Sequence, residues 1–131
     1  MKVIVCKTTG KNYIKDLGDL KPEDIREINA VLHEAVGGHL EIVRPKGLQR
    51  PYVMICNENF IYEQLPFNLI ASSLYGTPEH GEPILGDVVI MKEENEYLTG
   101  MTEDEARQIK CTFDILLAIA GKHKRKEEKD E

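Results

Sequence analysis

Residues 52–56 read YVMIC, an apolar run of strand length that ends at the polar residues Asn57 and Glu58. Because almost every side chain in the run is apolar, we expect a strand that is covered on both faces in the interior of a sheet. Residues 2–6 (KVIVC) form a shorter β-branched run, and residues 84–91 (ILGDVVIM) predict the last long strand. Within that strand, Gly86 indicates a bulge or the close approach of another backbone segment.

Shorter patterns predict the elements around these strands. Residues 13–17 are expected to pair with residues 2–6 as a hairpin. Apolar residues at three- and four-residue spacing then predict a helix that begins near Pro22 and ends at Gly37-Gly38. We also expect short strands at residues 39–44 and 60–62 and a brief helix within residues 66–75. The residues predicted to face inward from the two helices are Ile25, Ile28, Leu32 and Val36 in the first and Leu69, Ile70 and Leu74 in the second.

The last helix has the clearest signature. Thr102 and Glu105 form the pattern T-x-x-E, a capping box, in front of an apolar stripe. Beyond Ile115 the helix is apolar on nearly all sides, so a stripe packed on the sheet leaves Ile115 and Ile119 pointing elsewhere. We expect these two residues to form the interface of a homodimer, and a fold-back of the loop around residues 60–62 is the alternative cover. The stripe expected to pack on the sheet is Ala106, Ile109, Phe113, Leu116 and Ala120.

Strands and helices are mixed without a strict βαβ rhythm, which predicts an α+β fold. Its expected parts are a small, mainly antiparallel sheet, a helix after the first hairpin, a short middle helix and a C-terminal helix. The chain is expected to form a single domain over residues 1–121. Residues 122–131 (KHKRKEEKDE) carry mixed charges and no apolar side chain, so they are predicted to be a frayed helix end or a disordered tail.

Composition excludes several classes of protein. The 131 residues have a formal net charge of −6, so the basic face of a general DNA-binding protein is not expected. The sequence shows neither a signal peptide nor an apolar run approaching the roughly 20 residues of a membrane span, so no membrane partner is expected. Cys6, Cys56 and Cys111 are an odd number without a C-x-x-C pair, which fits reduced thiols in the cytoplasm.

Catalytic and metal-binding patterns are weak. No local catalytic signature surrounds a nucleophile, and no histidine pair has the spacing of a zinc site. The glycine patterns of Walker and dinucleotide-binding loops are absent from the sequence. We therefore expect no catalytic residues, no metal and no cofactor. The candidate nucleophiles and bases considered are Cys56, Ser72, Ser73, His33, His39 and His80.

Four short motifs occur in order: Ala35-Val36-Gly37-Gly38-x-Leu40-Glu41-Ile42-Val43, Cys56-Asn57-Glu58, Leu65-Pro66-x-Asn68 and Gly86-Asp87-Val88-Val89-Ile90. With this pattern, residues 1–109 resemble a small family catalogued as domain of unknown function 3846, found mostly in phages, prophages and other mobile elements. Two features depart from the family pattern: residues 60–64 are more aromatic, and the helix over residues 102–120 is longer and more apolar. No catalytic residues are carried over.

The resemblance implies an accessory or host-interaction protein of a mobile element in a bacterial cytoplasm. We expect a non-enzymatic binding protein that binds a host protein or sequesters a small molecule, and counter-defence is its most concrete version. One alternative is an enzyme that acts on a nucleotide or nucleic acid through His80 and nearby acids. Another is an acidic nucleic-acid mimic.

Two groups of residues are candidates for binding. Asn57 and Asn68 either build the fold, by closing a turn and fixing the chain beside it, or line a pocket. Tyr75, Thr77 and His80 belong to a glycine- and proline-rich loop over residues 75–83, and exposed loops on a rigid scaffold often carry binding residues.

Overall fold

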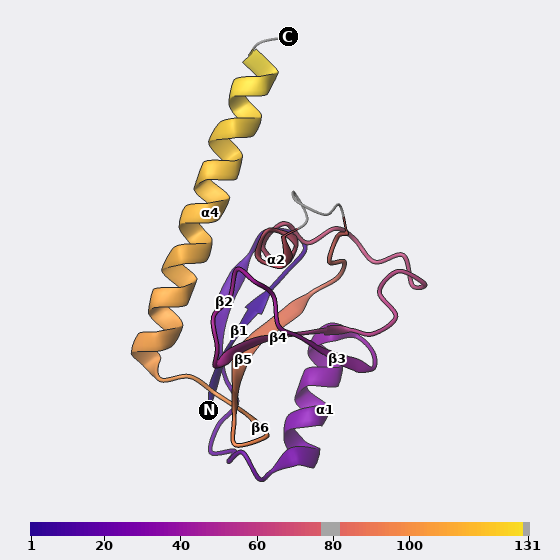
Figure 1. The fold of residues 1–131 in the computed structure, drawn as a ribbon, viewed down its shortest axis with the longest axis vertical. Coiled ribbons are helices and arrows are strands. Elements are labelled where there is room, and N and C mark those ends of the chain that lie inside the picture. Colours follow the sequence, from indigo (N-terminus) through magenta and orange to yellow (C-terminus); the bar gives the residue numbers. More distant parts are fainter. Residues whose placement is uncertain (77–81, 130–131) are drawn as a thin grey trace.

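The computed structural model describes residues 1–76 and 82–129, with side chains described as far as residue 121. Its strands form one antiparallel sheet in the order β2-β1-β5-β4-β3, with β6 paired to β5. Helices flank the sheet in the expected places, so the predicted α+β fold is confirmed (Figure 1). The elements are β1 (Lys2–Cys6), β2 (Asn12–Asp16), α1 (Ile25–Val36), β3 (Leu40–Val43), β4 (Tyr52–Asn57), α2 (Leu69–Tyr75), β5 (Val88–Glu94), β6 (Tyr97–Thr99) and α4 (Glu103–Lys129).

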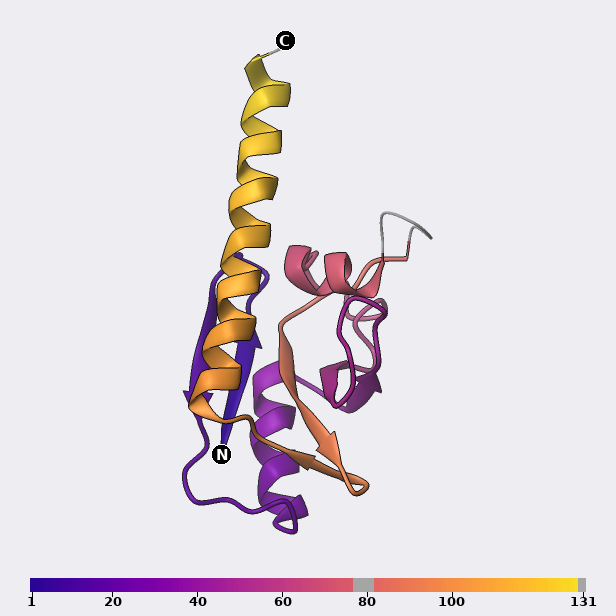
Figure 2. The same ribbon diagram turned by 60° about the vertical axis from the view of Figure 1, so that its left-hand side comes forward.

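The central strands β1, β5 and β4 are covered on both faces. Ile90 of β5 lies opposite Ile4 of β1 on one side and Met54 of β4 on the other. These three side chains pack in one core with residues of α2 and α4, whereas the neighbouring Val89 packs in a second core with residues of α1. Helix α1 thus packs on one face of the sheet, and α2 and α4 pack on the other. Figure 2 shows α4 running alongside β1 and β2. Burial on both faces explains the continuous apolar runs in the sequence.

Helix α1 carries the predicted buried stripe along most of its length. Ile28, Leu32 and Val36 are buried, but Ile25 begins the helix and is 52% exposed, so its inward prediction is wrong. Gly37 ends the helix with a φ of 76°, the left-handed conformation that glycine adopts at little cost.

Two expectations for the middle of the chain are corrected. Residues 60–62 are not a strand, because successive turns there are closed by hydrogen bonds from Glu63 N to Asn59 O and from Gln64 N to Ile61 O. Leu69 is the first residue of α2 and is 39% exposed, whereas Ile70 and Leu74 are buried as predicted.

The last long strand begins at Val88 and not at residue 84 as predicted, because Gly86 interrupts the strand geometry. The φ of this glycine, +86°, lies outside strand geometry, and a Cβ there would lie 2.8 Å from Leu65 Cδ1. The close neighbour of Gly86 is therefore the Leu65 side chain and not a second backbone segment, as the sequence had suggested. At its other end, β5 turns through Asn95 and Glu96, both with positive φ, into β6, which the sequence did not predict.

Helix α4 begins with the predicted capping box. Thr102 N donates to Glu105 Oε1 at 3.0 Å, and Glu105 N donates to Thr102 Oγ1 at 3.2 Å. The predicted inward stripe contacts the sheet, with Phe113 fully buried, while Ile115 and Ile119 are 53% and 59% exposed. The helix extends to Lys129, so most of the charged tail continues it, and the boundary between domain and tail stays a prediction.

The capping box predicts how stability changes in acid. The Thr102 backbone N–H, the Tyr52 hydroxyl and Lys92 all contact the Glu105 carboxylate and lower its pKa from 4.5 to about 2. A carboxyl with a lowered pKa in the folded state stabilises the protein above its unfolded pKa and loses that contribution as the pH falls toward the folded value. We expect Glu105→Gln to reduce the loss of unfolding free energy between about pH 4.5 and pH 2.

Urea unfolding at a series of pH values measures this effect. Glu23→Gln, which replaces an exposed carboxyl ahead of α1, is the matched control and should retain the acid dependence of the wild type. Equal losses of unfolding free energy in wild type and Glu105→Gln would contradict the prediction.

Candidate functional site

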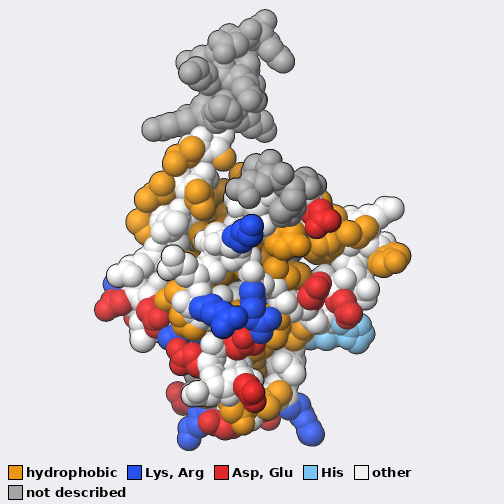
Figure 3. Space-filling model, in the orientation of Figure 1, with side chains coloured by type: hydrophobic (Ala, Val, Ile, Leu, Met, Phe, Trp, Pro, Cys, Tyr) orange, Lys and Arg blue, Asp and Glu red, His pale blue; other side chains and the backbone are white. Residues whose placement is uncertain are grey.

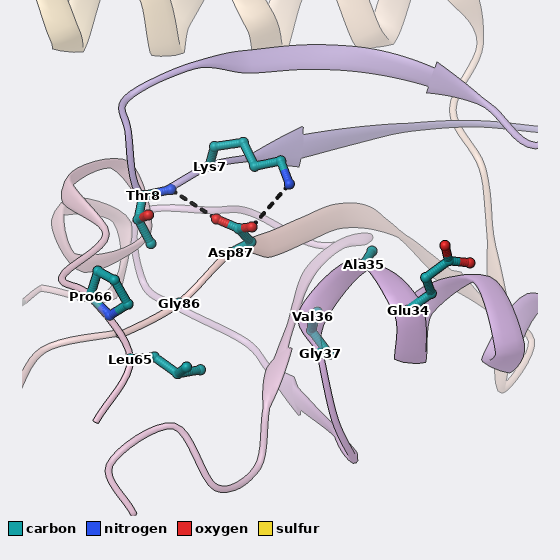
Figure 4. Close-up of a pocket in the computed structure, with 10 residues that line it drawn as sticks. All are labelled: Lys7, Thr8, Glu34, Ala35, Val36, Gly37, Leu65, Pro66, Gly86 and Asp87. Carbon is teal, nitrogen blue, oxygen red and sulfur yellow. Dashed lines mark hydrogen bonds and ion pairs between the residues drawn. The ribbon is translucent and has the colours of Figure 1, made fainter. Parts of the chain in front are cut away.

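A pocket of about 410 Å³ lies where the end of β1, the start of β5 and the C-terminal turn of α1 meet. We name it the Lys7–Asp87 pocket after the ion pair in its wall. Figure 4 shows Leu65 and Pro66 on one side and the end of α1 on the other. The pocket is lined by Lys7, Thr8, Glu34, Ala35, Val36, Gly37, Leu65, Pro66, Gly86 and Asp87.

The ion pair supplies the polar wall. Lys7 Nζ lies 3.0 Å from Asp87 Oδ2, and the backbone N–H of Thr8 donates to Asp87 Oδ1 at 2.9 Å (Figure 4). The hydrogen bond with Asp87 raises the pKa of Lys7, which favours the charged ammonium group. The Lys7 and Asp87 side chains are 39% and 28% exposed, so solvent and ligands can reach them.

The opposite wall is electronegative. Glu34 lies in the last turn of α1, where the helix dipole already places partial negative charge on the backbone carbonyls. A carboxylate at this end of a helix is unfavourable for the helix itself. Because Asp87 is neutralised by Lys7, the uncompensated negative charge of the pocket comes from Glu34 and the end of the helix.

Asn57 supports this wall from below the surface. Its side chain is fully buried, and Nδ2 donates to Val36 O at 3.3 Å and to Glu63 Oε2 at 3.0 Å. Its Oδ1 accepts from Asn59 N at 2.7 Å and closes the turn after β4. A Cβ on Gly38 would lie 2.7 Å from Asn57 Nδ2, so Gly38 leaves the room that this amide requires.

Asn68 fixes the wall that carries the Lys7–Asp87 ion pair. Its Oδ1 accepts from Ala71 N at 3.0 Å and caps α2, while Nδ2 donates to Cys6 O at 3.0 Å and to Gly86 O at 2.9 Å. Cys6 and Gly86 directly precede Lys7 and Asp87, so one buried amide fixes the two chain segments that carry the ion pair. Asn57 and Asn68 both lie behind the pocket and do not line it.

The second group of candidate residues, Tyr75, Thr77 and His80, lies elsewhere in the fold or outside the described residues. Tyr75 ends α2 and lines a separate cavity of about 340 Å³ beside β3 and β4, together with Cys56 and Phe60. Thr77 and His80 lie outside the described residues. The structure therefore does not bring Tyr75 to the Lys7–Asp87 pocket.

Sequence reasoning missed Lys7, Glu34 and Asp87 as site residues. The available signal was the Gly86-Asp87 pair within the last family motif, together with the polar residues that directly follow the first strand. The order of the strands in the sheet could not be predicted from the sequence. This order places the end of β1 beside the start of β5.

Two buried cysteines and two of the candidate histidines lie within the described residues. Burial raises the pKa of the Cys6 and Cys56 thiols to about 12, so neither is a thiolate nucleophile at neutral pH. His33 and His39 contact each other edge-on, with ring centroids 5.5 Å apart. Within residues 1–76 and 82–121, whose side chains the structure describes, no group of three side chains of the metal-ligating types is placed to hold an ion.

The fold and the pocket define a small α+β domain in which helices cover both faces of an antiparallel sheet. The chain belongs to the family described as a domain of unknown function (DUF3846), whose model matches residues 1–114. No curated protein and no solved structure matches the chain. None of the helices in the described ranges has the length and hydrophobicity needed to cross a membrane.

The hydrogen bonds of Asn68 predict a large loss of stability on truncation. Asn68→Ala removes a helix cap and leaves two buried carbonyls without their donor, which should lower the unfolding free energy by about 2–4 kcal/mol. Chemical denaturation measures the change. Asn29→Ala, at an exposed position of α1, is the control and should change stability by less than about 0.5 kcal/mol. A loss below about 1 kcal/mol for Asn68→Ala would show that water replaces the lost hydrogen bonds.

Proposed function

We propose that this chain is a non-enzymatic binding protein of a phage or another mobile element, and that it holds a small polar molecule in the Lys7–Asp87 pocket. The observation that carries the proposal is the convergence of the family motifs. The segments around Gly37, Pro66 and Gly86, which are distant in sequence, line the same cavity. Asn57 and Asn68 hold these segments from behind without entering the cavity.

The charges around the pocket favour a ligand with N–H donor groups. Glu34 and the carbonyl end of α1 attract a cationic or hydrogen-bond-donating group, and they oppose a phosphate. Lys7 can contact an acceptor on the same molecule while it remains paired with Asp87. Leu65 and Pro66 offer apolar area to the rest of the ligand. A volume of about 410 Å³ suits a molecule the size of a nucleoside or a dipeptide.

Sequestration of a signalling molecule by a mobile element would make the protein a counter-defence protein. This step rests on the family's usual genetic context and not on the pocket. The alternative of an enzyme acting on a nucleotide or nucleic acid depends on His80, which lies outside the described residues. The acidic nucleic-acid mimic depends on the net charge of −6 alone.

A host protein is the second candidate partner. The loop after β4 presents Ile61 and Tyr62 with 65% and 89% of their side chains exposed. Exposed aromatic and aliphatic side chains on one loop are typical anchors of protein interfaces. This loop is also where the sequence departs from the family pattern, which fits a partner particular to this chain.

Replacement of Glu34 tests the ligand proposal directly. Glu34→Gln keeps the size of the side chain but removes the charge, so we expect weaker binding of a guanidinium probe such as agmatine. Because a carboxylate is unfavourable at the end of α1, the same variant should gain about 0.3 kcal/mol or more of stability. Calorimetric titration and thermal unfolding measure the two effects, and inorganic phosphate is the probe expected not to bind.

Controls separate a pocket effect from a general charge effect. Glu93→Gln removes a carboxylate from a different surface ion pair, with Arg44, and should bind the probe as the wild type does. Asp87→Asn should change the set of small molecules that the protein retains from a bacterial extract, as identified by mass spectrometry. Identical sets for wild type and Asp87→Asn would count against the pocket, and preferential binding of phosphate would count against the ligand class.

A further inference from the structure

Helix α4 carries a second pattern on the side that faces away from the sheet. Going along the helix, exposed residues recur after four, three, four and three positions, which is the spacing of a coiled-coil seam. These residues lie on the opposite side of the helix from the stripe that contains Phe113 and Leu116. We name them the outward stripe, which consists of Asp104, Gln108, Cys111, Ile115 and Ala118.

The outward stripe is uncovered and apolar toward its centre and end. Ile115 is 53% exposed, and Ile119 beside the stripe is 59% exposed. Figure 3 shows hydrophobic side chains gathered on the described part of α4 where it rises beyond the sheet. A groove of about 270 Å³ between α2 and α4 adjoins this face and is lined by Leu69, Leu117 and Ile119 among others.

The chain's own loop does not cover this face. Phe60 and Ile61 line the cavity beside β3 and β4, whereas α4 packs over β1 and β2 at the other end of the sheet. Ile61 is itself 65% exposed. The fold-back that would have shielded Ile115 and Ile119 within one copy is therefore not the arrangement of this fold.

We propose that the outward stripe pairs with the same stripe of a second copy, antiparallel, about a two-fold axis that passes beside Phe113. In this register two facing residues lie equally far before and after residue 113, so the stripe positions from Gln108 to Ala118 face one another. Cys111 faces Ile115 of the second copy, and Gln108 faces Ala118. Facing positions of two helices in an antiparallel seam have this relation, and two-fold pairs are the commonest oligomers.

Charge supports a second copy as the occupant. The same register places position 104, an aspartate in the acidic first turn, opposite position 122, a lysine that continues the four-residue spacing from Ala118. Asp104 of each helix thus lies at the level of the basic sequence KHKRK of the other copy, over residues 122–126. The neighbouring Glu103 and Glu105 are already paired within their own chain. A parallel pair would instead place like charges together at each end.

The oligomeric state of the wild type and of one variant tests whether the outward stripe forms a dimer interface. We expect the wild type to be a dimer at high micromolar concentration by sedimentation equilibrium, and Ile115→Glu to raise its dissociation constant about tenfold or more. Ile25→Glu is the matched control, because Ile25 is 52% exposed on α1 and lies on the other side of the sheet. Circular dichroism verifies that each variant is folded. A folded, monomeric wild type at high micromolar concentration would overturn the proposal.

Disulfide trapping tests the orientation. In a Cys111→Ser background, the double variant Gln108→Cys/Ala118→Cys should form a covalent dimer on mild oxidation, because these positions face each other across the pair. Each single variant should remain uncrosslinked, since the two copies of one position lie about 15 Å apart along the antiparallel helices, too far for a disulfide. Covalent dimers from the single variants would indicate a parallel pair and overturn the proposed register.

Charge exchange tests the ends of the pair. Asp104→Lys should weaken dimerisation several-fold, and Asp104→Lys/Lys122→Asp should recover most of the loss because the facing charges are exchanged. If the double variant dimerises no better than Asp104→Lys alone, positions 104 and 122 do not face each other and the register is wrong.

Discussion

The side-chain amide of Asn68 is the contact on which much of this fold depends. It accepts a hydrogen bond from the first turn of α2 and donates to the ends of two chain segments, at Cys6 and Gly86. These segments belong to neighbouring strands of the sheet, so a single buried group joins a helix, two loops and the start of the pocket. Burial makes the contact demanding, because a buried backbone group that loses a hydrogen-bond partner costs free energy.

The geometry of the Lys7–Asp87 pocket depends on these hydrogen bonds of Asn68. Lys7 and Asp87 each follow a residue that Asn68 holds, so the distance between their charged groups is set by the backbone and not by two flexible side chains alone. Glu34 reaches the same cavity from α1, which the other buried asparagine, Asn57, ties to the turn after β4. A carboxylate at the disfavoured end of a helix lowers the stability of that helix, which fits the ligand-binding role that we propose for Glu34.

Local patterns predicted most of the fold, and the errors have a common cause. The central strand β4, the stripe of α1 and the capping box of α4 follow from periodicity and end signals, which depend on nearby residues. The start of β5 was placed too early because its position depends on Gly86 and on Leu65, which is distant in sequence. Residues 60–62 have strand-like composition but lie in turns that neighbouring backbone groups close.

The pocket was harder to predict than the fold, since its charged residues come from three separate segments that meet only through the sheet order. The sequence did identify Asn57 and Asn68, and their polar type in apolar surroundings was the signal. Only the structure shows that both asparagines lie behind the pocket wall.

The three cysteines differ in a way that has a practical chemical consequence. Cys6 and Cys56 are buried in the core as neutral thiols, whereas Cys111 is exposed on α4. In the folded protein, thiol-alkylating reagents therefore meet one accessible thiol. That sulfur lies at the centre of the outward stripe, so its rate of alkylation should fall as protein concentration rises if the stripes pair. The native chain thus contains its own probe of association, without any engineered label.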